Sequence, residues 1–385
     1  MELLFLGLFA IAGGVFLLDD NDDEEDVNEE PDEPTLTTFG DLTLSETAEG
    51  DATVYGTDGD DVFASNSGDG AALDDYAFDN GLQMNALHAG DGDDTIHTTY
   101  YDSFGNTDPA PTVFGEAGDD SIHSQWANVD GGEGNDNIDI LVQPHSGSDI
   151  VQIGEGGDGN DVLHARSDLS GHQVVPSGNF ELHGGAGDDT LSGYAGEFFG
   201  DEGNDSIAVD GTFPDDASVE GGAGDDTISV DRMVHFYSRY DDDTSRVEFD
   251  DGNFEVSGDE GADRFEVNAD IRYVQDGLTP AILTTITDFD PDEDVLSFTY
   301  ETGETNPYVS GFLPQTDTVN HNVSFAGLFE ASDGSYTDVM ISVTGEDASD
   351  SSILTQDFAV RLEGVTNLDP NSVTLDPING EILIG

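Results

Sequence analysis

The feature that most constrains this chain is a loop motif, Gly-Gly-x-Gly-x-Asp-x-Φ with Φ apolar, which occurs nine times. Glycines allow a tight turn with positive φ, and the apolar residue after the turn can begin a short strand. Five copies are near complete, although Ala replaces the first Gly in one: residues 89–96, 131–138, 156–163, 184–191 and 221–228. Four copies lack the second Gly: residues 56–63, 115–122, 200–207 and 258–265. Units this short cannot bury an apolar face alone, so we expect them to stack.

The spacing of the copies predicts one motif per turn of a stacked coil. Successive copies are separated by 33, 26, 16, 25, 28, 16, 21 and 37 residues. An apolar residue also stands two places before the first loop residue in eight copies: Val54, Leu87, Val113, Val129, Leu182, Phe198, Val219 and Val256. Each copy therefore reads as strand, Gly-Asp turn and strand. We expect the well-formed turns on one side of the coil, with insertions in the opposite half-turn.

The sixth position of the motif supplies candidate metal ligands, because it is Asp in every copy and carboxylate oxygens suit Ca²⁺. These residues are Asp61, Asp94, Asp120, Asp136, Asp161, Asp189, Asp205, Asp226 and Asp263. In five copies a fifth-position Asp could add oxygen ligands: Asp60, Asp93, Asp119, Asp188 and Asp225. A single Asp-Gly loop is an ordinary solvated turn. Nine copies with the same Asp favour an array of cation sites.

This repeat resembles the RTX, or hemolysin-type, calcium-binding repeat, over roughly residues 54 to 300. The resemblance implies an all-β fold, a parallel β-roll or β-solenoid of calcium-binding repeats with a C-terminal β cap. It also implies that Ca²⁺ lies between loops of neighbouring turns, held by the sixth-position aspartates and by backbone carbonyls. Tandem RTX repeats recur every nine residues, with loops on two sides of the roll. The wider spacing here favours a single calcium row.

The charge balance is extreme, with 7 basic residues, 86 acidic residues and a net charge of −79. Carboxylates in stacked loops repel one another, so we expect folding to be coupled to Ca²⁺ binding. Extracellular calcium modules bind at roughly 10⁻⁴–10⁻³ M, and such sites fill outside a cell. The charge also favours a saline habitat, such as that of a marine or halophilic bacterium. It excludes nucleic acid and anionic membranes as electrostatic partners.

Four segments are expected along the chain. Residues 1–18 are apolar and form a short membrane anchor or an atypical export segment, and residues 19–35 form an acidic linker. Residues 36–265 form the calcium-binding roll, and residues 266–385 form a C-terminal cap. The last five residues, 381–385, resemble a type I secretion signal, although an ordinary last strand explains them almost as well. The chain has no Cys, which excludes disulfides.

No catalytic motif is recognisable, and we predict that the chain is not an enzyme. Histidines recur at equivalent positions, as His97, His123 and His164 after the motif and as His88 and His183 before it. A row of them could bind a transition metal, but solvent-facing strand positions explain them better. The sequence thus predicts a calcium-binding secreted or surface protein with a structural or adhesive role. A polysaccharide-binding module and a β-helix polysaccharide-modifying enzyme, similar to a lyase or epimerase, stay open as alternatives, with glycans or cell-surface components as partners.

Overall fold

The computed structural model describes the greater part of the chain from residue 35 onward. The described ranges are 35–39, 42–46, 51–64, 83–98, 111–125, 127–142, 151–167, 180–194, 196–211, 217–234, 254–271, 280–301, 318–347, 353–369, 372–376 and 381–384. All of them lie in one compact unit, Pro34–Gly385. The expected anchor at residues 1–18 lies outside the described residues. Within those residues, no helix is long and apolar enough to cross a membrane.

The described residues form two β-sheets. The 15-stranded sheet, sheet A, has in spatial order β1 (Thr35–Phe39), β2 (Leu42–Glu46), β3 (Asp51–Tyr55), β5 (Gln83–Asp91), β7 (Thr112–Ala117), β9 (Asn128–Glu133), β11 (Gln152–Asp158), β13 (Phe180–Ala186), β15 (Gly196–Glu202), β17 (Ala217–Ala223), β19 (Phe254–Glu260), β21 (Ala281–Ile286), β25 (Ile353–Glu363), β24 (Tyr336–Asp347) and β23 (Thr318–Glu330).

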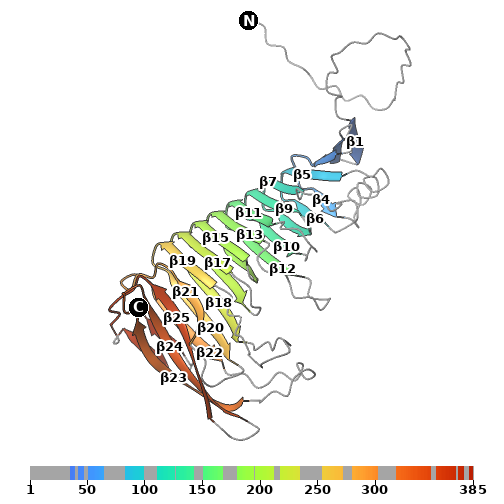
Figure 1. The fold of residues 1–385 in the computed structure, drawn as a ribbon. Coiled ribbons are helices and arrows are strands. Elements are labelled where there is room, and N and C mark those ends of the chain that lie inside the picture. The colour runs from blue at the N-terminus through green and yellow to red at the C-terminus, as the bar shows by residue number, and fades with distance from the viewer. Residues whose placement is uncertain are drawn as a thin grey trace, which may run out of the picture. The chain divides into compact units, whose positions relative to one another are not determined.

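The 12-stranded sheet, sheet B, has in spatial order β26 (Val373–Asp376), β27 (Glu381–Ile384), β22 (Val295–Glu301), β20 (Arg264–Ile271), β18 (Thr227–Val234), β16 (Ser206–Gly211), β14 (Thr190–Tyr194), β12 (Val162–Ser167), β10 (Asn137–Val142), β8 (Ser121–Gln125), β6 (Thr95–Thr98) and β4 (Val62–Ala64). Chain order alternates between the sheets, so one strand of sheet A, a turn and one strand of sheet B make one coil. Neighbouring coils pair in parallel in both sheets, and their strands form the ladder in Figure 1.

The core lies between the sheets and consists of two apolar rows. The residue two places before each motif faces inward in sheet A and is in register from coil to coil, as in Val54 opposite Leu87. In the coil of β11 this position is Gly154, and Ile140 and Leu182 approach to within van der Waals contact of its empty side. The motif's apolar residue forms the facing row of sheet B, with Phe63, Ile96, Ile122, Ile138, Leu163, Leu191, Ile207, Ile228 and Phe265 all buried. The predicted all-β parallel solenoid is confirmed.

All motif turns join a strand of sheet A to the next strand of sheet B, and they therefore lie on one side of the solenoid. The opposite connection, from sheet B back to sheet A, varies widely in length. It spans a single residue between β14 and β15 and nineteen residues between β18 and β19. The motifs are therefore unequally spaced because the connections from sheet B to sheet A differ in length. The motif turns on the other side keep a constant register.

Both ends of the solenoid are closed by antiparallel strands, which protect the open edges of a parallel stack. At the N-terminal end, β1 and β2 form a hairpin on β3. The parallel coils continue past residue 265 through β21 and β22, since both strands pair in parallel with the preceding coil. Antiparallel strands follow as β23, β24 and β25 within the expected C-terminal β cap, with β25 docked in parallel on β21. Residues 381–384 form β27, which pairs antiparallel with β22.

Candidate cation site

The third glycine of each motif permits close stacking of the turns. At Gly159 and Gly187 φ is +152° and +136°, a region that favours glycine. An added Cβ at Gly187 would lie only 1.7 Å from the carbonyl oxygen of Gly159 in the preceding coil. Each turn therefore packs directly against the backbone of the preceding turn, and no side chain fits between them.

The second position of the motif takes a left-handed backbone even where glycine is absent. Glu116, Asp201 and Asp259 have φ values of +76°, +73° and +66°. Gly185, at the same position in its own coil, has φ of +105°. Four copies of the motif lack the second Gly. Three of these four nevertheless fold into the same turn as the complete copies, because the stacked neighbours impose its shape.

The sixth-position aspartates form one continuous buried row along the turns. Oδ1 of each aspartate after Asp61 accepts a hydrogen bond from the backbone N–H of the equivalent residue in the preceding coil. Asp161 N donates to Asp189 Oδ1 at 2.7 Å, and the same bond recurs from Asp61 through Asp263 at 2.6–2.9 Å. Eight of the nine aspartates are buried, all but Asp61, with at most 3% exposure. The structure thus brings together all nine residues that the sequence predicted.

The second oxygen, Oδ2, has no such partner in the middle of the row. It is buried and accepts no hydrogen bond from the described residues in Asp94, Asp120, Asp136, Asp161, Asp189, Asp205 and Asp226. In six of these coils Oδ2 and a backbone carbonyl face the same small space beside the first glycine. A Cβ built on Gly131 would lie 2.2 Å from Asp136 Oδ2 and 2.5 Å from the carbonyl oxygen of Gly156. The equivalent first glycines are Gly115, Gly131, Gly156, Gly184, Gly200 and Gly221.

Burial and crowding raise the pKa of the carboxyls in this row. Desolvation is the main cause, and neighbouring carboxylates add to it, while the backbone N–H bond to Oδ1 acts in the opposite direction. The pKa rises to about 7 for Asp136 and Asp205, and to about 6 for Asp94, Asp189 and Asp263. Full ionisation of the carboxyls in this row is therefore unfavourable unless a cation is bound.

The two ends of the row differ from its middle. Asp61 Oδ2 accepts hydrogen bonds from the backbone N–H and the hydroxyl of Thr57, at 2.7 and 3.0 Å. At the other end the row gains Asp294, whose Oδ1 accepts from Asp263 N at 2.9 Å and whose Oδ2 accepts from Asp290 N at 2.7 Å. Side-chain and backbone donors thus satisfy Oδ2 at both ends.

Asp294 was not among the residues predicted from sequence, because no glycine-rich loop precedes it. A weaker signal was present, since Asp294 stands two places before the buried Leu296, as the sixth-position Asp does before Φ. Asp294 is buried, and its pKa is raised by the same desolvation.

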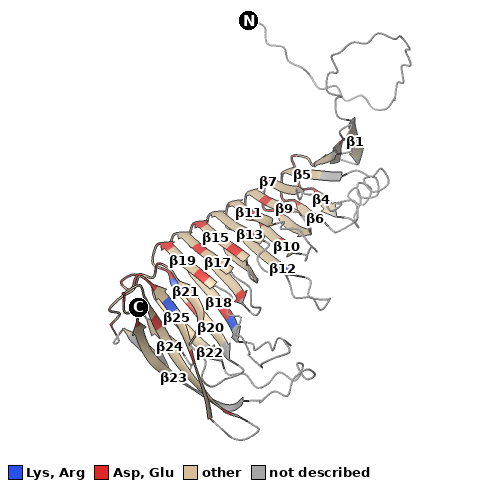
Figure 2. Cartoon of the chain, viewed as in Figure 1, with Lys and Arg blue, Asp and Glu red and all other residues tan. Residues whose placement is uncertain are grey.

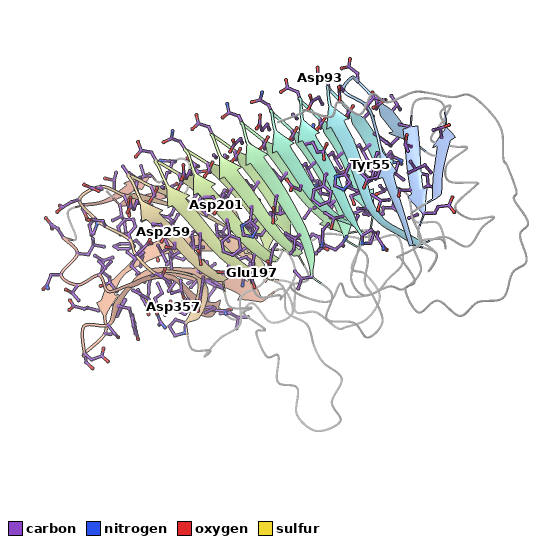
Figure 3. All side chains as sticks on the ribbon, turned by 90° about the horizontal axis from the view of Figure 1, so that it is seen from above. Tyr55, Asp93, Glu197, Asp201, Asp259 and Asp357 are labelled. Atoms are coloured by element: carbon purple, nitrogen blue, oxygen red, sulfur yellow. The ribbon has the colours of Figure 1, made fainter. Side chains whose placement is uncertain are left out.

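The fifth-position residues form a separate, exposed ladder at the edge of the turns. Asp119 Oδ1 accepts from the backbone and side-chain N–H groups of Asn135, at 2.8 and 3.0 Å. These bonds lower the pKa of Asp119. The same bond, from a backbone N–H to the side-chain oxygen of the fifth-position residue in the preceding coil, recurs whether that residue is Asp or Asn. Figure 3 shows Asp93 projecting from this edge. The structure therefore separates the fifth-position side chains, which are exposed, from the buried row.

The histidines at equivalent positions form contacts between coils. On sheet B the rings of His97 and His123 stack at 4.6 Å, and His123 Nδ1 lies 2.9 Å from Asp139 Oδ2. Burial, with a smaller contribution from His123, lowers the pKa of His97. On sheet A His88 stacks between Tyr55 and Phe114. These contacts agree with solvent-facing strand positions.

No group of three or more His, Asp or Glu side chains in the described ranges is arranged to hold a metal ion by itself. The parallel register explains this, since adjacent strands of a sheet lie ~4.8 Å apart and each coil contributes one buried carboxylate. A cation in the row would need backbone carbonyls as additional ligands. The glycine carbonyls that face Oδ2 meet this requirement, so the residues fit a hard cation such as Ca²⁺.

Stacked parallel coils and glycine turns define a parallel β-solenoid with a row of buried carboxylates along one edge. Comparison with family models agrees: four segments match the RTX calcium-binding nonapeptide repeat, at residues 84–99, 153–168, 181–207 and 215–232. The repeats in these four segments are therefore RTX calcium-binding repeats. A search of curated proteins found no match.

Proposed function

We propose that this chain is a secreted structural module whose solenoid folds when Ca²⁺ enters the aspartate row. RTX repeats bind Ca²⁺ and are typical of secreted proteins. The observation that carries the proposal is the set of six coils in which a buried Oδ2 and a glycine carbonyl face one space.

The charge of the buried row supports a requirement for a cation. An unpaired buried carboxylate is strongly unfavourable, so it must bind either a proton or a counter-ion. Protons meet that need only below about pH 6–7, where the raised pKa values of Asp136, Asp189 and Asp205 lie. At the mildly alkaline pH of saline water a divalent cation is required.

The ligands in each of the six coils would be Oδ2 of the sixth-position Asp and the carbonyl oxygen of the first glycine in the next coil, together with further oxygens of the loop backbone. Ca²⁺ accepts six to eight oxygens in flexible geometry, whereas Mg²⁺ demands a near-ideal octahedron. A backbone-rich site with one carboxylate oxygen per coil is therefore expected to prefer Ca²⁺. The bound ion supplies the positive charge that lets the carboxylates stack.

The functional role that follows is mechanical. Each coil contacts only its neighbours, so stiffness depends on every junction along the stack. With Ca²⁺ bound, the solenoid becomes a rigid, strongly acidic spacer suited to a structural or adhesive role at a surface. In a compartment where Ca²⁺ is scarce the row is unfilled, which keeps the chain unfolded before export.

The test is a far-UV circular dichroism titration of the full chain at pH 8 and constant ionic strength, with Ca²⁺ and with Mg²⁺ as control. We expect a cooperative gain of β signal with Ca²⁺ in the range of ~10⁻⁴–10⁻³ M, as for other extracellular sites, and none with Mg²⁺ at the same concentrations. A fully folded spectrum in chelator, unchanged by Ca²⁺, would refute the proposal.

A further inference from the structure

One coil differs from all the others at the first position of its motif. Eight of the nine motifs begin with Gly, whereas the motif of Asp94 begins with Ala89. Ala89 is fully buried and directly follows His88, which pairs with Phe114 on the neighbouring strand. Ala89 is therefore level with Gly115, the first glycine of the next coil, and its side chain points inward like the core residues of sheet A.

A Cβ at this first position would occupy the place of a cation. In the six middle coils, an ideal Cβ built on the first glycine lies 2.2–2.5 Å from Oδ2 of the sixth-position Asp. It lies 2.2–2.8 Å from the carbonyl oxygen of the first glycine in the next coil. Bonds between Ca²⁺ and oxygen are ~2.3–2.6 Å long. The point that a Cβ would fill is therefore at bonding distance from both oxygens that face the space.

In the coil of Asp94 a methyl group fills this point. Nonbonded carbon and oxygen atoms stay at least ~3.0 Å apart, so Asp94 Oδ2 and the carbonyl oxygen of Gly115 cannot converge on an ion where the methyl stands. The methyl of Ala89 belongs to the apolar core between the sheets. Asp94 Oδ2 is buried and accepts no hydrogen bond from the described residues. This coil therefore has the ligand oxygens but not the space for an ion between them.

We propose that Ala89 excludes a cation from the coil of Asp94 and thereby sets the N-terminal limit of the ion row. This inference rests on the proposed binding of Ca²⁺ in the six middle coils. The coil before it offers no unpaired oxygen either, because the backbone N–H and the hydroxyl of Thr57 both donate to Asp61 Oδ2, at 2.7 and 3.0 Å. The first two coils are thus held by hydrogen bonds and apolar packing, and ions begin at the third.

The alternative is a cation that moves away from Ala89 toward the loop and is held there by Asp94 and loop carbonyls. Removal of the methyl distinguishes the two arrangements. An ion that is merely shifted is already bound in the wild-type chain, so Ala89→Gly would leave the number of bound ions unchanged. An ion that is excluded enters only when the methyl is gone, so the same variant gains one.

The first test is anomalous diffraction from calcium in crystals of the full wild-type chain grown in saturating Ca²⁺. We expect peaks beside Oδ2 in the six middle coils and none beside Asp94. A peak beside Asp94 overturns the proposal. Absence of peaks from the whole row contradicts the proposed calcium function instead, so the two failures are distinguishable.

The second test counts the Ca²⁺ ions bound per chain by equilibrium dialysis and atomic emission. Figure 2 shows acidic residues on strands along the solenoid, so the dialysis is done in 1 M NaCl, where a Debye length of ~3 Å suppresses diffuse binding. Ala89→Gly opens the space, and the double variant Ala89→Gly/Asp94→Asn then removes a ligand from it. Ala186→Gly is the matched control, because it makes the same exchange at the third position of another motif. Gly156→Ala is the reciprocal variant, since it adds a methyl to a middle coil.

We expect Ala89→Gly to bind one ion more than the wild type and Gly156→Ala to bind one fewer. Ala186→Gly and the double variant should bind the wild-type number. The proposal is overturned if folded Ala89→Gly or Gly156→Ala keeps the wild-type number, if Ala186→Gly gains an ion equally, or if the double variant retains the gained ion. Circular dichroism of the same samples shows whether each variant is folded, and the diffraction map of the wild type decides where a variant is not.

Discussion

Asp188 and Asp189 are adjacent in sequence and lie in opposite environments. Asp188 belongs to the exposed fifth-position ladder, in which Asn204 donates to its Oδ1 from both backbone and side chain. Asp189 belongs to the buried row, where its Oδ1 accepts from Asp161 and its Oδ2 faces a glycine carbonyl. The conformation of the turn before β14 makes this difference, and the two residues give a matched pair of variants.

Asp189→Asn is expected to raise the Ca²⁺ concentration at the folding midpoint several-fold, because it removes one anionic ligand. It should not lower the folded fraction of the chelated protein at pH 5, since the amide oxygen still accepts from Asp161 N and no buried charge is added. Asp188→Asn should leave both properties unchanged, as Asn already occupies that position in Asn135, Asn160 and Asn204. Calcium titrations followed by circular dichroism measure both. Equal shifts in the two variants would show that the buried row is not the calcium site.

The glycines of one turn are also unequal. Gly185→Asp places a residue where Asp201 and Asp259 stand naturally with φ of +73° and +66°. A shift of φ from +105° toward those values relieves the 2.2 Å approach of the new Cβ to the carbonyl oxygen of Gly157, and the left-handed backbone then costs about 1–3 kcal/mol. Gly187→Ala should destabilise by more, because its Cβ would meet a backbone carbonyl at 1.7 Å. Urea unfolding in saturating Ca²⁺ compares the two. The reverse order of stability would mean that the turns can separate freely.

At the scale of the coil, the row of carboxyls predicts an unusual pH dependence. The folded pKa values of Asp136 and Asp205 are raised to about 7, above the usual value of 3.8. Between these values the folded state binds more protons than the unfolded chain, so the free energy of unfolding falls as pH rises. The contribution is complete below about pH 4 and is lost through pH 7, at about 1.4 kcal/mol per pKa unit for each buried carboxyl.

The chelated protein, unfolded at pH 8, is therefore expected to gain folded structure as the pH falls to 5, whereas in saturating Ca²⁺ the protein is folded at both pH values. Far-UV circular dichroism in chelator and in Ca²⁺ across this pH range measures the effect. The control is Asp189→Asn, in which the slope in chelator should be smaller because one titrating carboxyl is absent. Chelated protein that gains stability from pH 5 to pH 8 would contradict the raised pKa values.

The pairing of coils explains why motif spacings as different as 16 and 37 residues give one regular row. Each turn is fixed by backbone bonds to its neighbours, as in Gly187 N to the carbonyl oxygen of Glu202 at 2.7 Å. The extra residues enter on the opposite side, between sheet B and sheet A. Insertions in those connections are therefore compatible with an intact cation row.

At the scale of the whole molecule, the net charge of −79 exceeds what the cation row can neutralise. Six divalent ions offset only a small part of it, and the remaining carboxylates repel one another across the surface. Salt screens this repulsion, because the Debye length falls from ~10 Å at 0.1 M to ~3 Å at 1 M.

The calcium-loaded protein is accordingly expected to gain thermal stability as NaCl rises from 0.1 to 1 M. Saturating Ca²⁺ is kept constant, so that competition of Na⁺ for the row does not enter the comparison. Calorimetric Tm values at the two salt concentrations check this, with a sugar of equal osmolality as control. A fall in Tm with NaCl would indicate that surface ion pairs, such as Arg264 with Glu266, outweigh the general repulsion.

The coil, the apolar rows and the Asp row could be predicted from the amino-acid sequence, because turn and strand chemistry recur locally in each copy. The motif predicted that Asp94 through Asp263 align and that Val54 and Leu87 share a core. What faces Oδ2 in the middle of the row could not be predicted, since the glycine carbonyl there belongs to the next coil. Thr57 satisfies Asp61 and the backbone of Asp290 satisfies Asp294, whereas the six middle coils are left with a glycine carbonyl facing Oδ2. The parallel docking of β25 on β21 likewise arises from contacts between residues distant in sequence, which no local pattern encodes.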